Sequence, residues 1–424
     1  MDSRSSDIPP PKLISALRGF NLLPAIVFLP TRRRCDEAAA EVANDKSQRA
    51  DPERQAQRQN IFQEFAIENP EILDHKHAKL IVRSGVAAHH AGHIPSWKLL
   101  IEKLMSAGLL NALFATSTVA AGVDFPARTV VVSNADTRGN DGWRPLTASE
   151  LQQMTGRAGR RGRDKVGFVV LAPGQFQNPK KIAELLKALP DPLVSRFRAT
   201  YTSLLNLLDA FGNFEQIQEI AEKSFSVFRN PKSEIRNREN WEPFDRRAKV
   251  LDHFGYLNYG LETVTEEGKW LADLRIDRPL LVGEALRDGI FDEITVAEAA
   301  GLMASVASDA DRSYGEMRAS RSMFDLLADF EDLVVKVSNI EWKHGVEPAE
   351  EINYSAAAAA ERWTAGMEWD ELVARTRAEE GDLVRLLSRT GEALRQLANL
   401  RDSNPSAASI AHAASGAMLR EPVR

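Results

Sequence analysis

The segment 153–162 combines a glutamine, a glycine and two arginines whose spacing could hold the terminal phosphates of a nucleotide. These residues are Gln153, Gly156, Arg157 and Arg160. A guanidinium group is planar, permanently charged and bidentate toward phosphate, and a glycine lets a ligand approach the backbone closely. We therefore predict a phosphate-binding surface here. The alternative is a solvated basic helix end, because arginines there also complement the helix dipole.

A helix is predicted to position these side chains. Thr147 followed by Glu150 forms a capping box, which is typical of a helix start. On a helix that continues through the segment, Gln153, Arg157 and Arg160 fall along one face. All three side chains should then point toward the same ligand.

The sequence lacks the loop with which many nucleotide-binding enzymes cradle the β- and γ-phosphates and Mg²⁺. No G-x-x-x-x-G-K-[ST] motif occurs, and the Gly-Lys step at Gly268 stands in an unrelated context. Asp36 and Glu37 resemble the start of a Walker B acidic motif, but they lie in an alanine-rich helical stretch. We interpret them as the solvated face of a helix. The second wall of the nucleotide site is therefore expected from residues outside this sequence.

Composition and charge place the anionic ligand in the first part of the chain. The 424 residues are 43% hydrophobic and 27% charged, as in an ordinary globular protein of two or three domains. Residues 1–175 hold 23 Lys and Arg against 18 Asp and Glu, whereas residues 176–424 hold 31 against 42. The single cysteine, Cys35, excludes an intrachain disulfide and is expected to be buried. With no signal-peptide or membrane-span pattern, we expect a cytoplasmic protein and no membrane partner.

The hydrophobic pattern predicts an α/β domain followed by helices. Up to about residue 174, short β-branched runs alternate with amphipathic helices, which is typical of a parallel sheet covered by helices. Strands are predicted at 25–29, 110–115, 129–133 and 166–171, and helices at 32–43, 95–107 and, from Asp191 and Pro192, up to Gly212. Residues 246–275 suggest a small winged-helix unit, and residues from about 276 onward an all-helical bundle.

These motifs together resemble the C-terminal half of a superfamily 2 helicase of the superkiller, exosome-associated type, which is DEAD/DEAH-box-like. The segment from Gln153 to Gly162 resembles motif VI of that family. The resemblance implies that Arg157 and Arg160 act as arginine fingers on the γ-phosphate, while Gln153 helps to position the nucleotide and the attacking water. In such helicases two RecA-like domains bind ATP with Mg²⁺ between them. This chain would supply the second domain, and the first, which holds the metal, would come from another polypeptide.

The resemblance also implies a domain order. Residues 1–22 would be a linker, 23–175 the second RecA-like domain, 176–275 connecting helices and a winged-helix domain, and 276–424 a ratchet-like helical bundle. The long stalk and arch insertion of some family members has no room here. Because Walker A and Walker B motifs are absent from the sequence, the chain is expected to be inactive alone.

Further contacts follow from the resemblance. Residues 114–127 resemble motif V, in which Gly122 and Asp124, together with Gly156, Arg157 and Arg160, would bind the nucleotide. Single-stranded nucleic acid, RNA in preference to DNA, would contact Thr31, Arg32, His89, His90, Gly92, Thr116, Thr118, Arg385 and Arg389. For the threonine hydroxyls, local turn capping is the alternative. For the two arginines of the predicted ratchet helix, pairing with Glu392 is the alternative.

Three imidazoles within five residues, at His89, His90 and His93, raise the separate hypothesis of a metal site. The neighbouring sequence offers no cysteine and no second histidine cluster to complete a tetrahedral set. We therefore predict no metal and favour a place beside the nucleic-acid path.

We interpret the chain as the nucleic-acid-tracking half of an ATP-dependent RNA helicase. One rival is a non-catalytic nucleic-acid-binding or regulatory module. A winged-helix DNA-binding regulator is weaker, because residues 246–256 offer only three basic side chains besides His253. The helicase interpretation fails if Arg157 and Arg160 are both buried against local acids.

Overall fold

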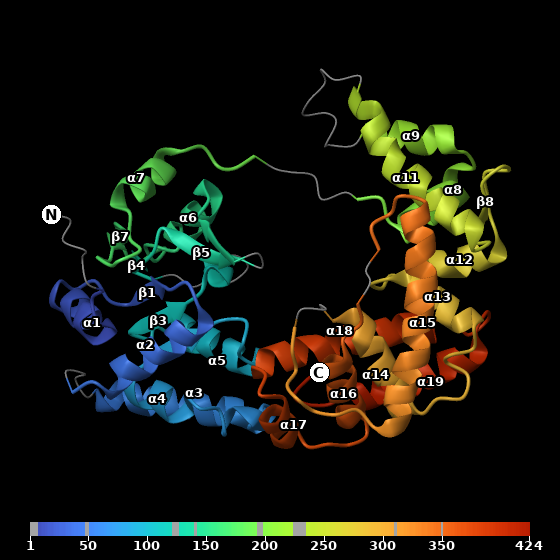
Figure 1. Ribbon diagram of the computed structural model, residues 1–424. Coiled ribbons are helices and arrows are strands. Elements are labelled where there is room, and N and C mark those ends of the chain that lie inside the picture. The colour runs from blue at the N-terminus through green and yellow to red at the C-terminus, as the bar shows by residue number, and fades with distance from the viewer. Residues whose placement is uncertain are drawn as a thin grey trace. The chain divides into compact units, whose positions relative to one another are not determined.

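The computed structural model describes the backbone of residues 7–46, 51–120, 127–139, 142–192, 198–223, 235–308, 312–348 and 351–424. The chain divides into two compact units, Met1–Pro192 and Leu193–Arg424 (Figure 1). No helix among the described residues is long and apolar enough to cross a lipid bilayer.

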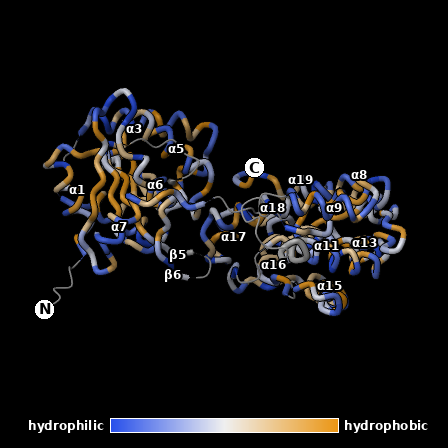
Figure 2. The backbone as a smooth tube through the Cα atoms, turned by 90° about the horizontal axis from the view of Figure 1, so that it is seen from above, coloured by the Kyte–Doolittle hydropathy of each residue, from blue (hydrophilic) through white to orange (hydrophobic). Residues whose placement is uncertain are grey.

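A five-stranded parallel sheet forms the centre of the first unit, and hydrophobic residues gather there between α1 and α6 in Figure 2. The strands are β1 (Ala25–Phe28), β2 (Val86–His89), β3 (Ala112–Ala115), β4 (Thr129–Val132) and β7 (Phe168–Leu171), in the spatial order β2-β3-β1-β4-β7. All four neighbouring pairs are parallel. The four predicted strands are confirmed. Strand β2 was not predicted, because its two alanines and one histidine carry little strand propensity.

Helices cover this sheet, as predicted. They are α1 (Pro10–Gly19), α2 (Arg32–Asn44), α3 (Pro52–Glu68), α4 (Ala78–Ser84), α5 (Pro95–Ser106), α6 (Ala148–Thr155) and α7 (Pro179–Lys187). Two short 3-10 helices, η1 (Pro70–Ile72) and η2 (Ser117–Ala120), and a hairpin of β5 (Asp136–Gly139) and β6 (Gly142–Pro145) complete the unit. The α2 face with Cys35, Ala38 and Val42 is buried in the same apolar cluster as β1 and β3. The predicted burial of Cys35 is confirmed.

Helix α6 begins as predicted but ends early. The Thr147 hydroxyl accepts the Glu150 N–H, and the Glu150 carboxylate accepts the Thr147 N–H, so the capping box is present. The helix stops at Thr155, and Gly159 adopts φ +91°, which is a glycine conformation that a helix cannot contain. Arg157 and Arg160 therefore lie in the loop after the helix. The prediction that they share a helical face with Gln153 is wrong.

The second unit is helical. Its helices are α8 (Tyr201–Phe211), α9 (Phe214–Glu222), α11 (Ile235–His253), α12 (Glu266–Asp273), α13 (Pro279–Arg287), α14 (Val296–Ala307), α15 (Arg321–Lys343), α16 (Tyr354–Thr364), α17 (Trp369–Thr376), α18 (Glu380–Ala398) and α19 (Pro405–Met418). An antiparallel pair, β8 (Leu257–Asn258) and β9 (Thr263–Val264), stands between α11 and α12. Buried side chains from Tyr201 to Val423 form one continuous hydrophobic cluster.

The start of α8 corrects one prediction. The helix begins at Tyr201, after the Thr200 hydroxyl accepts the Ser203 N–H, and residues 198–200 are not helical. A helix that opens at Asp191 and Pro192 is therefore wrong, because the Thr200 cap provides a stronger start than the proline. Around residues 246–275, the structure has α11, the hairpin of β8 and β9, and α12 in this order. The winged-helix assignment itself stays a prediction.

Candidate functional site

The loop after α6, which carries both candidate arginines, is fixed to the amino end of β4. The N–H of Ala127 donates to the carbonyl of Arg157 at 3.2 Å, and the N–H of Gly159 donates to the carbonyl of Ala127 at 2.7 Å. Gly167 passes so close that a Cβ there would lie 2.4 Å from the carbonyl oxygen of Ala158. Backbone contacts therefore set the path of residues 156–164, which we call the arginine loop.

Arg160 is oriented by a carboxylate of the same loop. Its Nε and Nη2 donate to the two oxygens of Asp164 at 2.7 and 2.9 Å, and its backbone N–H donates to Oδ2 at 3.0 Å. The Asp164 side chain is 2% exposed, whereas that of Arg160 is 22% exposed. The third guanidinium nitrogen, Nη1, takes no part in this pair. A bidentate pair fixes the plane of the guanidinium as well as its position.

The hydrogen bonds between Arg160 and Asp164 also determine the ionisation of Asp164. The hydrogen bonds from Arg160 lower the pKa of Asp164 to about 2, against the opposing effect of burial. Arg128 adds to this effect, because its Nη1 lies 3.5 Å from Oδ1 of Asp164. Asp164 is therefore a carboxylate at neutral pH, and the pair raises the pKa of the Arg160 guanidinium.

The other predicted nucleotide contacts lie around this loop. Gln153 is exposed on the last turn of α6, Gly156 is exposed at its C-cap, and Arg157 is half-buried. Arg160 is paired with an acid, but its side chain is not fully buried. The condition that would contradict the helicase interpretation, burial of both arginines, is therefore not met. Gly122 and Asp124 lie outside the described residues, so their role stays a prediction.

The candidate nucleic-acid contacts of the first unit come from the opposite edge of the sheet. Thr31 and Arg32 follow β1, and Thr116 follows β3, which is the parallel neighbour of β1. The arginine loop is instead bonded to Ala127, ahead of β4. A four-residue strand spans about 13 Å, so the two groups are separated by the height of the sheet.

The hydroxyls at this carboxyl edge have local partners. Thr31 caps α2, because its Oγ1 accepts the Arg34 N–H at 3.3 Å. The Oγ1 atoms of Thr116 and Thr118 lie 2.9 Å apart. Capping of α2 thus accounts for the Thr31 hydroxyl, while the Thr116 and Thr118 hydroxyls pair with each other. Contact of these side chains with a strand stays a prediction.

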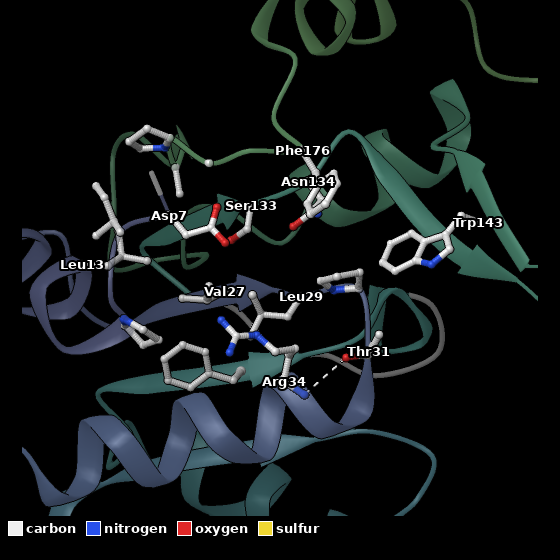
Figure 3. A pocket seen from close by; sticks show the side chains of 17 residues that line it. Asp7, Leu13, Val27, Leu29, Thr31, Arg34, Ser133, Asn134, Trp143 and Phe176 are labelled. Atoms are coloured by element: carbon white, nitrogen blue, oxygen red, sulfur yellow. Dashed lines mark hydrogen bonds between the residues drawn. The ribbon is translucent and has the colours of Figure 1, made fainter. Parts of the chain in front are cut away.

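A cavity of about 270 Å³ opens at the carboxyl ends of β1, β4 and β7, where Figure 3 shows its lining. Thr31 and Arg34 line it from the start of α2, and Asn134 from the segment after β4. Trp143 of β6 and Phe176 also line it, and each is 59% exposed. The cavity thus combines exposed aromatic rings with a guanidinium and an amide.

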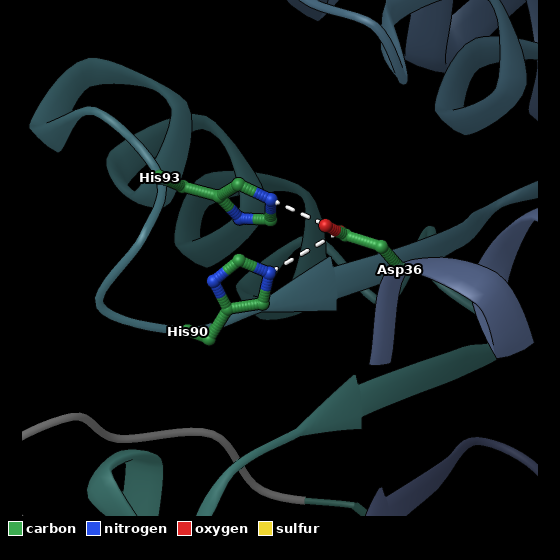
Figure 4. A group of neighbouring side chains, drawn as sticks. All are labelled: Asp36, His90 and His93. Atoms are coloured by element: carbon green, nitrogen blue, oxygen red, sulfur yellow. Dashed lines mark hydrogen bonds and ion pairs between the residues drawn. The ribbon is translucent and has the colours of Figure 1, made fainter. Parts of the chain in front are cut away.

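The histidine segment follows β2 at the same edge of the sheet, but its side chains are buried. His89 and His90 are 5% and 1% exposed, and Gly92 is buried. The Nε2 atoms of His90 and His93 each lie 3.2 Å from Oδ1 of Asp36 (Figure 4). In this arrangement the imidazoles contact the protein interior, and a contact of His89, His90 or Gly92 with nucleic acid stays a prediction.

The surroundings of Asp36 contradict two expectations from the sequence. The Asp36 side chain is 17% exposed and receives imidazoles, so it does not lie on a solvated helix face. A sequence pattern cannot say which helix face meets a segment 40 or more positions away. A second histidine pair, His75 and His77, also exists, and the Nε2 of His77 lies 2.9 Å from the same Asp36 oxygen. In the sequence, this pair is recognisable only as two histidines separated by one residue.

Comparison with known proteins finds a domain match within the second unit. Residues 261–424 match the DSHCT (NUC185) domain. The chain is also 34% identical over 253 residues to the DExH-box ATP-dependent RNA helicase DExH15, chloroplastic, of Arabidopsis thaliana, a match that covers 55% of this chain and 21% of that protein.

Two relatives from Mus musculus give the same result. Superkiller complex protein 2 is 33% identical over 251 residues, covering 57% of this chain and 19% of the relative. Exosome RNA helicase MTR4 is 33% identical over 223 residues, covering 52% and 21%. The predicted resemblance to superkiller and exosome-associated helicases is confirmed. The chain spans about a fifth of the length of these relatives.

Within the segment that matches the DSHCT domain, α18 carries Arg385 and Arg389, and its role as a ratchet-like helix stays a prediction. The buried side of α18 includes Leu383, Leu386, Leu387, Leu394 and Leu397. Arg389 pairs with Asp277, with Nη2 2.7 Å from Oδ2, and Arg385 lies 4.0 Å from Asp382. Glu392 pairs with Arg395 instead, so the acid that meets Arg389 comes from outside the helix. Exposed ion pairs contribute only about 0–1 kcal/mol, which leaves both arginines able to exchange their partners for phosphate.

Proposed function

We propose that the arginine loop completes an ATP site whose other wall lies on a first RecA-like domain outside these 424 residues. The chain then acts as the nucleic-acid-tracking half of an ATP-dependent RNA helicase. The observation that carries this proposal is the orientation of Arg160, which Asp164 fixes while the arginine side chain remains 22% exposed. The similarity to named RNA helicases supports it.

The arginine loop would act by electrostatic stabilisation. Negative charge spreads over the γ-phosphoryl oxygens during transfer, and a guanidinium that is already oriented stabilises that charge without reorganising. Arg157 and Arg160 would meet these oxygens, and Gln153 would position the attacking water. The cationic residues of this loop fit phosphate and not Mg²⁺. The metal, which neutralises the phosphates when ATP binds, would be held by the first domain, because the sequence carries no phosphate loop.

The carboxyl edge of the sheet would hold the strand. Thr31, Thr116 and Thr118 would donate to backbone phosphates. The cavity beside Trp143 and Arg34 offers an aromatic face and a cation, which suit a base and its phosphate. In the second unit, the winged-helix assignment and strand contacts by Arg385 and Arg389 belong to the same proposal.

A second function is favoured by one observation, the absence of a phosphate loop from the sequence. A non-catalytic nucleic-acid-binding module would need no nucleotide. It predicts RNA binding that ignores both ATP and the two loop arginines.

The test compares three proteins in one assay. The chain is combined with a first RecA-like domain, supplied either as a separate polypeptide or as the upstream part of a longer chain, and RNA-stimulated phosphate release is measured. Arg160→Ala should lower the rate by about 10³-fold or more, as for arginine fingers generally. Arg161→Ala changes the exposed neighbour and should leave the rate within a factor of two or so of the unaltered chain.

The outcomes separate the two functions. Equal rates for the two variants would overturn the helicase proposal. RNA binding without any stimulated phosphate release, unaffected by both substitutions, would establish the non-catalytic module.

A further inference from the structure

Five of the eight histidines of the chain gather in the first unit. They are His75, His77, His89, His90 and His93. All five are less than 8% exposed, and the rings of His90 and His93 lie 3.8 Å apart between centroids. The function proposed above uses no group from the interior of this cluster. Its centre is the carboxylate of Asp36, on α2.

Three imidazoles crowd one oxygen of that carboxylate. Oδ1 of Asp36 lies 2.9 Å from Nε2 of His77 and 3.2 Å from Nε2 of both His90 and His93. Oδ2 meets Nζ of Lys76 at 2.7 Å. A carboxylate oxygen has two lone pairs, so three N–H donors on Oδ1 exceed what it accepts well. A cation placed among these atoms would relieve the crowding.

The ligand atoms already stand near coordination distance. Oδ1 of Asp36 and one nitrogen each of His90 and His93 lie within 4.8 Å of one another. In a tetrahedral zinc site with bonds of 2.0–2.2 Å, ligand atoms are about 3.3–3.5 Å apart. The Asp36 to histidine separations of 3.2 Å match this spacing. Only small shifts are needed to close the set around an ion.

We propose that Asp36, His90 and His93 form a binding site for a divalent transition-metal ion, Zn²⁺ in particular. Imidazole nitrogen with one carboxylate oxygen suits Zn²⁺, whereas Mg²⁺ and Ca²⁺ prefer all-oxygen sets. His77 approaches the same carboxylate from another direction and supplies either the fourth ligand or a hydrogen bond to Asp36. Lys76, whose side chain is 59% exposed, can move into solvent when the metal takes its place.

The ring tautomers give the site a measurable signature. Coordination through Nε2 leaves the imidazole proton on Nδ1. Nδ1 of His93 is buried with no hydrogen-bond partner among the described residues, so it can carry that proton without losing a contact. Nδ1 of His90 instead accepts the N–H of Gly92 at 3.1 Å. Metal binding through His90 must therefore break the Gly92 hydrogen bond.

The ion would fasten two elements that are distant in sequence. Asp36 lies in the first turns of α2, and His90 and His93 lie in the turn between β2 and α5. A shared ion would join them at the cost of the present hydrogen bonds. The proposed site is therefore structural. Whether it binds metal does not depend on whether the chain takes part in ATP hydrolysis.

The experiment uses the full chain, freed of any histidine tag and stripped of metal. Zn²⁺ is titrated by calorimetry, and Co²⁺ is added separately to record the visible absorption of a tetrahedral site. We expect one ion per chain. Asp36→Asn and His93→Ala should each weaken binding by at least about tenfold, the lower end of the loss seen when a partner of a metal ligand is removed. His412→Ala, an exposed histidine on α19, is the matched control and should bind as the unaltered chain does.

Circular dichroism of each stripped variant shows whether it is folded. If a substitution unfolds the chain, the unaltered protein decides the matter through the Gly92 amide resonance, which must shift when Zn²⁺ binds. Binding that survives both substitutions would overturn the proposal. So would the absence of a stoichiometric ion, or an unmoved Gly92 resonance at saturation.

Discussion

Two carboxylates in the first unit organise their neighbours in opposite ways. Asp164 gives both oxygens to Arg160, whose Nε and Nη2 match the carboxylate in a bidentate pair. Asp36 instead gives one oxygen to three imidazoles and the other to Lys76. Each guanidinium hydrogen bond at Asp164 has its own lone pair, whereas the imidazoles at Asp36 compete for theirs. A matched pair positions a side chain, and a crowded one favours the entry of a further cation.

The difference also separates two kinds of function. The Arg160 side chain is partly exposed, and Asp164 takes only its Nε and Nη2, so a ligand of opposite charge can be added. The imidazoles of His90 and His93 are 1% exposed each, and their ligand must be small enough to enter the interior. A phosphate fits the first arrangement and a metal ion the second.

Asp164→Asn is expected to have the largest effect among the substitutions that test this comparison. The substitution removes the charge that orients Arg160 without touching the guanidinium itself. RNA-stimulated phosphate release by the complete enzyme should fall about 100-fold, the loss that a misplaced catalytic group causes. The effect should be smaller than that of Arg160→Ala. Zn²⁺ affinity should stay unchanged, because Asp164 is not part of the histidine cluster.

The matched control is Glu184→Gln, which neutralises an exposed carboxylate on α7. It should leave phosphate release unaltered. If Asp164→Asn behaved like this control, Asp164 would have no part in positioning Arg160.

A second effect is expected from the backbone that shapes the arginine loop. In Gly167→Ala the new Cβ would lie 2.4 Å from the carbonyl oxygen of Ala158, so backbone must move. The free energy of unfolding should fall by about 1–3 kcal/mol, as for overpacking elsewhere. Gly19→Ala provides the control, since a Cβ there meets nothing within 4 Å. Chemical denaturation of both variants measures the difference, and equal stabilities would show that the loop is not held as described.

The smallest effect concerns pH. The folded-state pKa of Asp164 is about 2, below the value of about 3.9 for an unfolded aspartate. The pair therefore stabilises the fold fully above about pH 4, and this contribution is lost as the pH falls through about 2. The difference in unfolding free energy between the unaltered chain and Asp164→Asn should be constant from pH 7 to about 5 and vanish toward pH 2. A difference that instead grew on acidification would contradict the assigned ionisation.

The sequence predicted the elements whose signals are local. The strands β1, β3, β4 and β7 are short runs rich in apolar residues, and the capping box at Thr147 lies within four residues. The end of α6 was missed because a glycine with φ +91° outweighed the helical spacing of the arginines. Asp164 lies four positions after Arg160 in the sequence, so the pairing of these two residues could have been predicted from the sequence.

The histidine cluster depended on contacts that no local pattern encodes. Asp36 meets partners 41 to 57 positions away, and they converge only once β2 joins the sheet. No metal was predicted, because no nearby cysteine and no second histidine cluster was recognised that could join His89, His90 and His93. That premise is wrong, since the fold brings Asp36 and His77 to them.

The central claim is that the arginine loop stabilises charge on a transferring phosphoryl group. Its most direct test is the affinity of the complete enzyme, with RNA bound, for ADP and for ADP with a planar fluoride mimic of the phosphoryl group. A residue that acts in the transition state should contribute to the mimic far more than to ADP. We predict that Arg160→Ala weakens binding of the mimic by about 10³-fold and that of ADP by less than about threefold. An equal loss for both ligands, or no loss for either, would contradict the account.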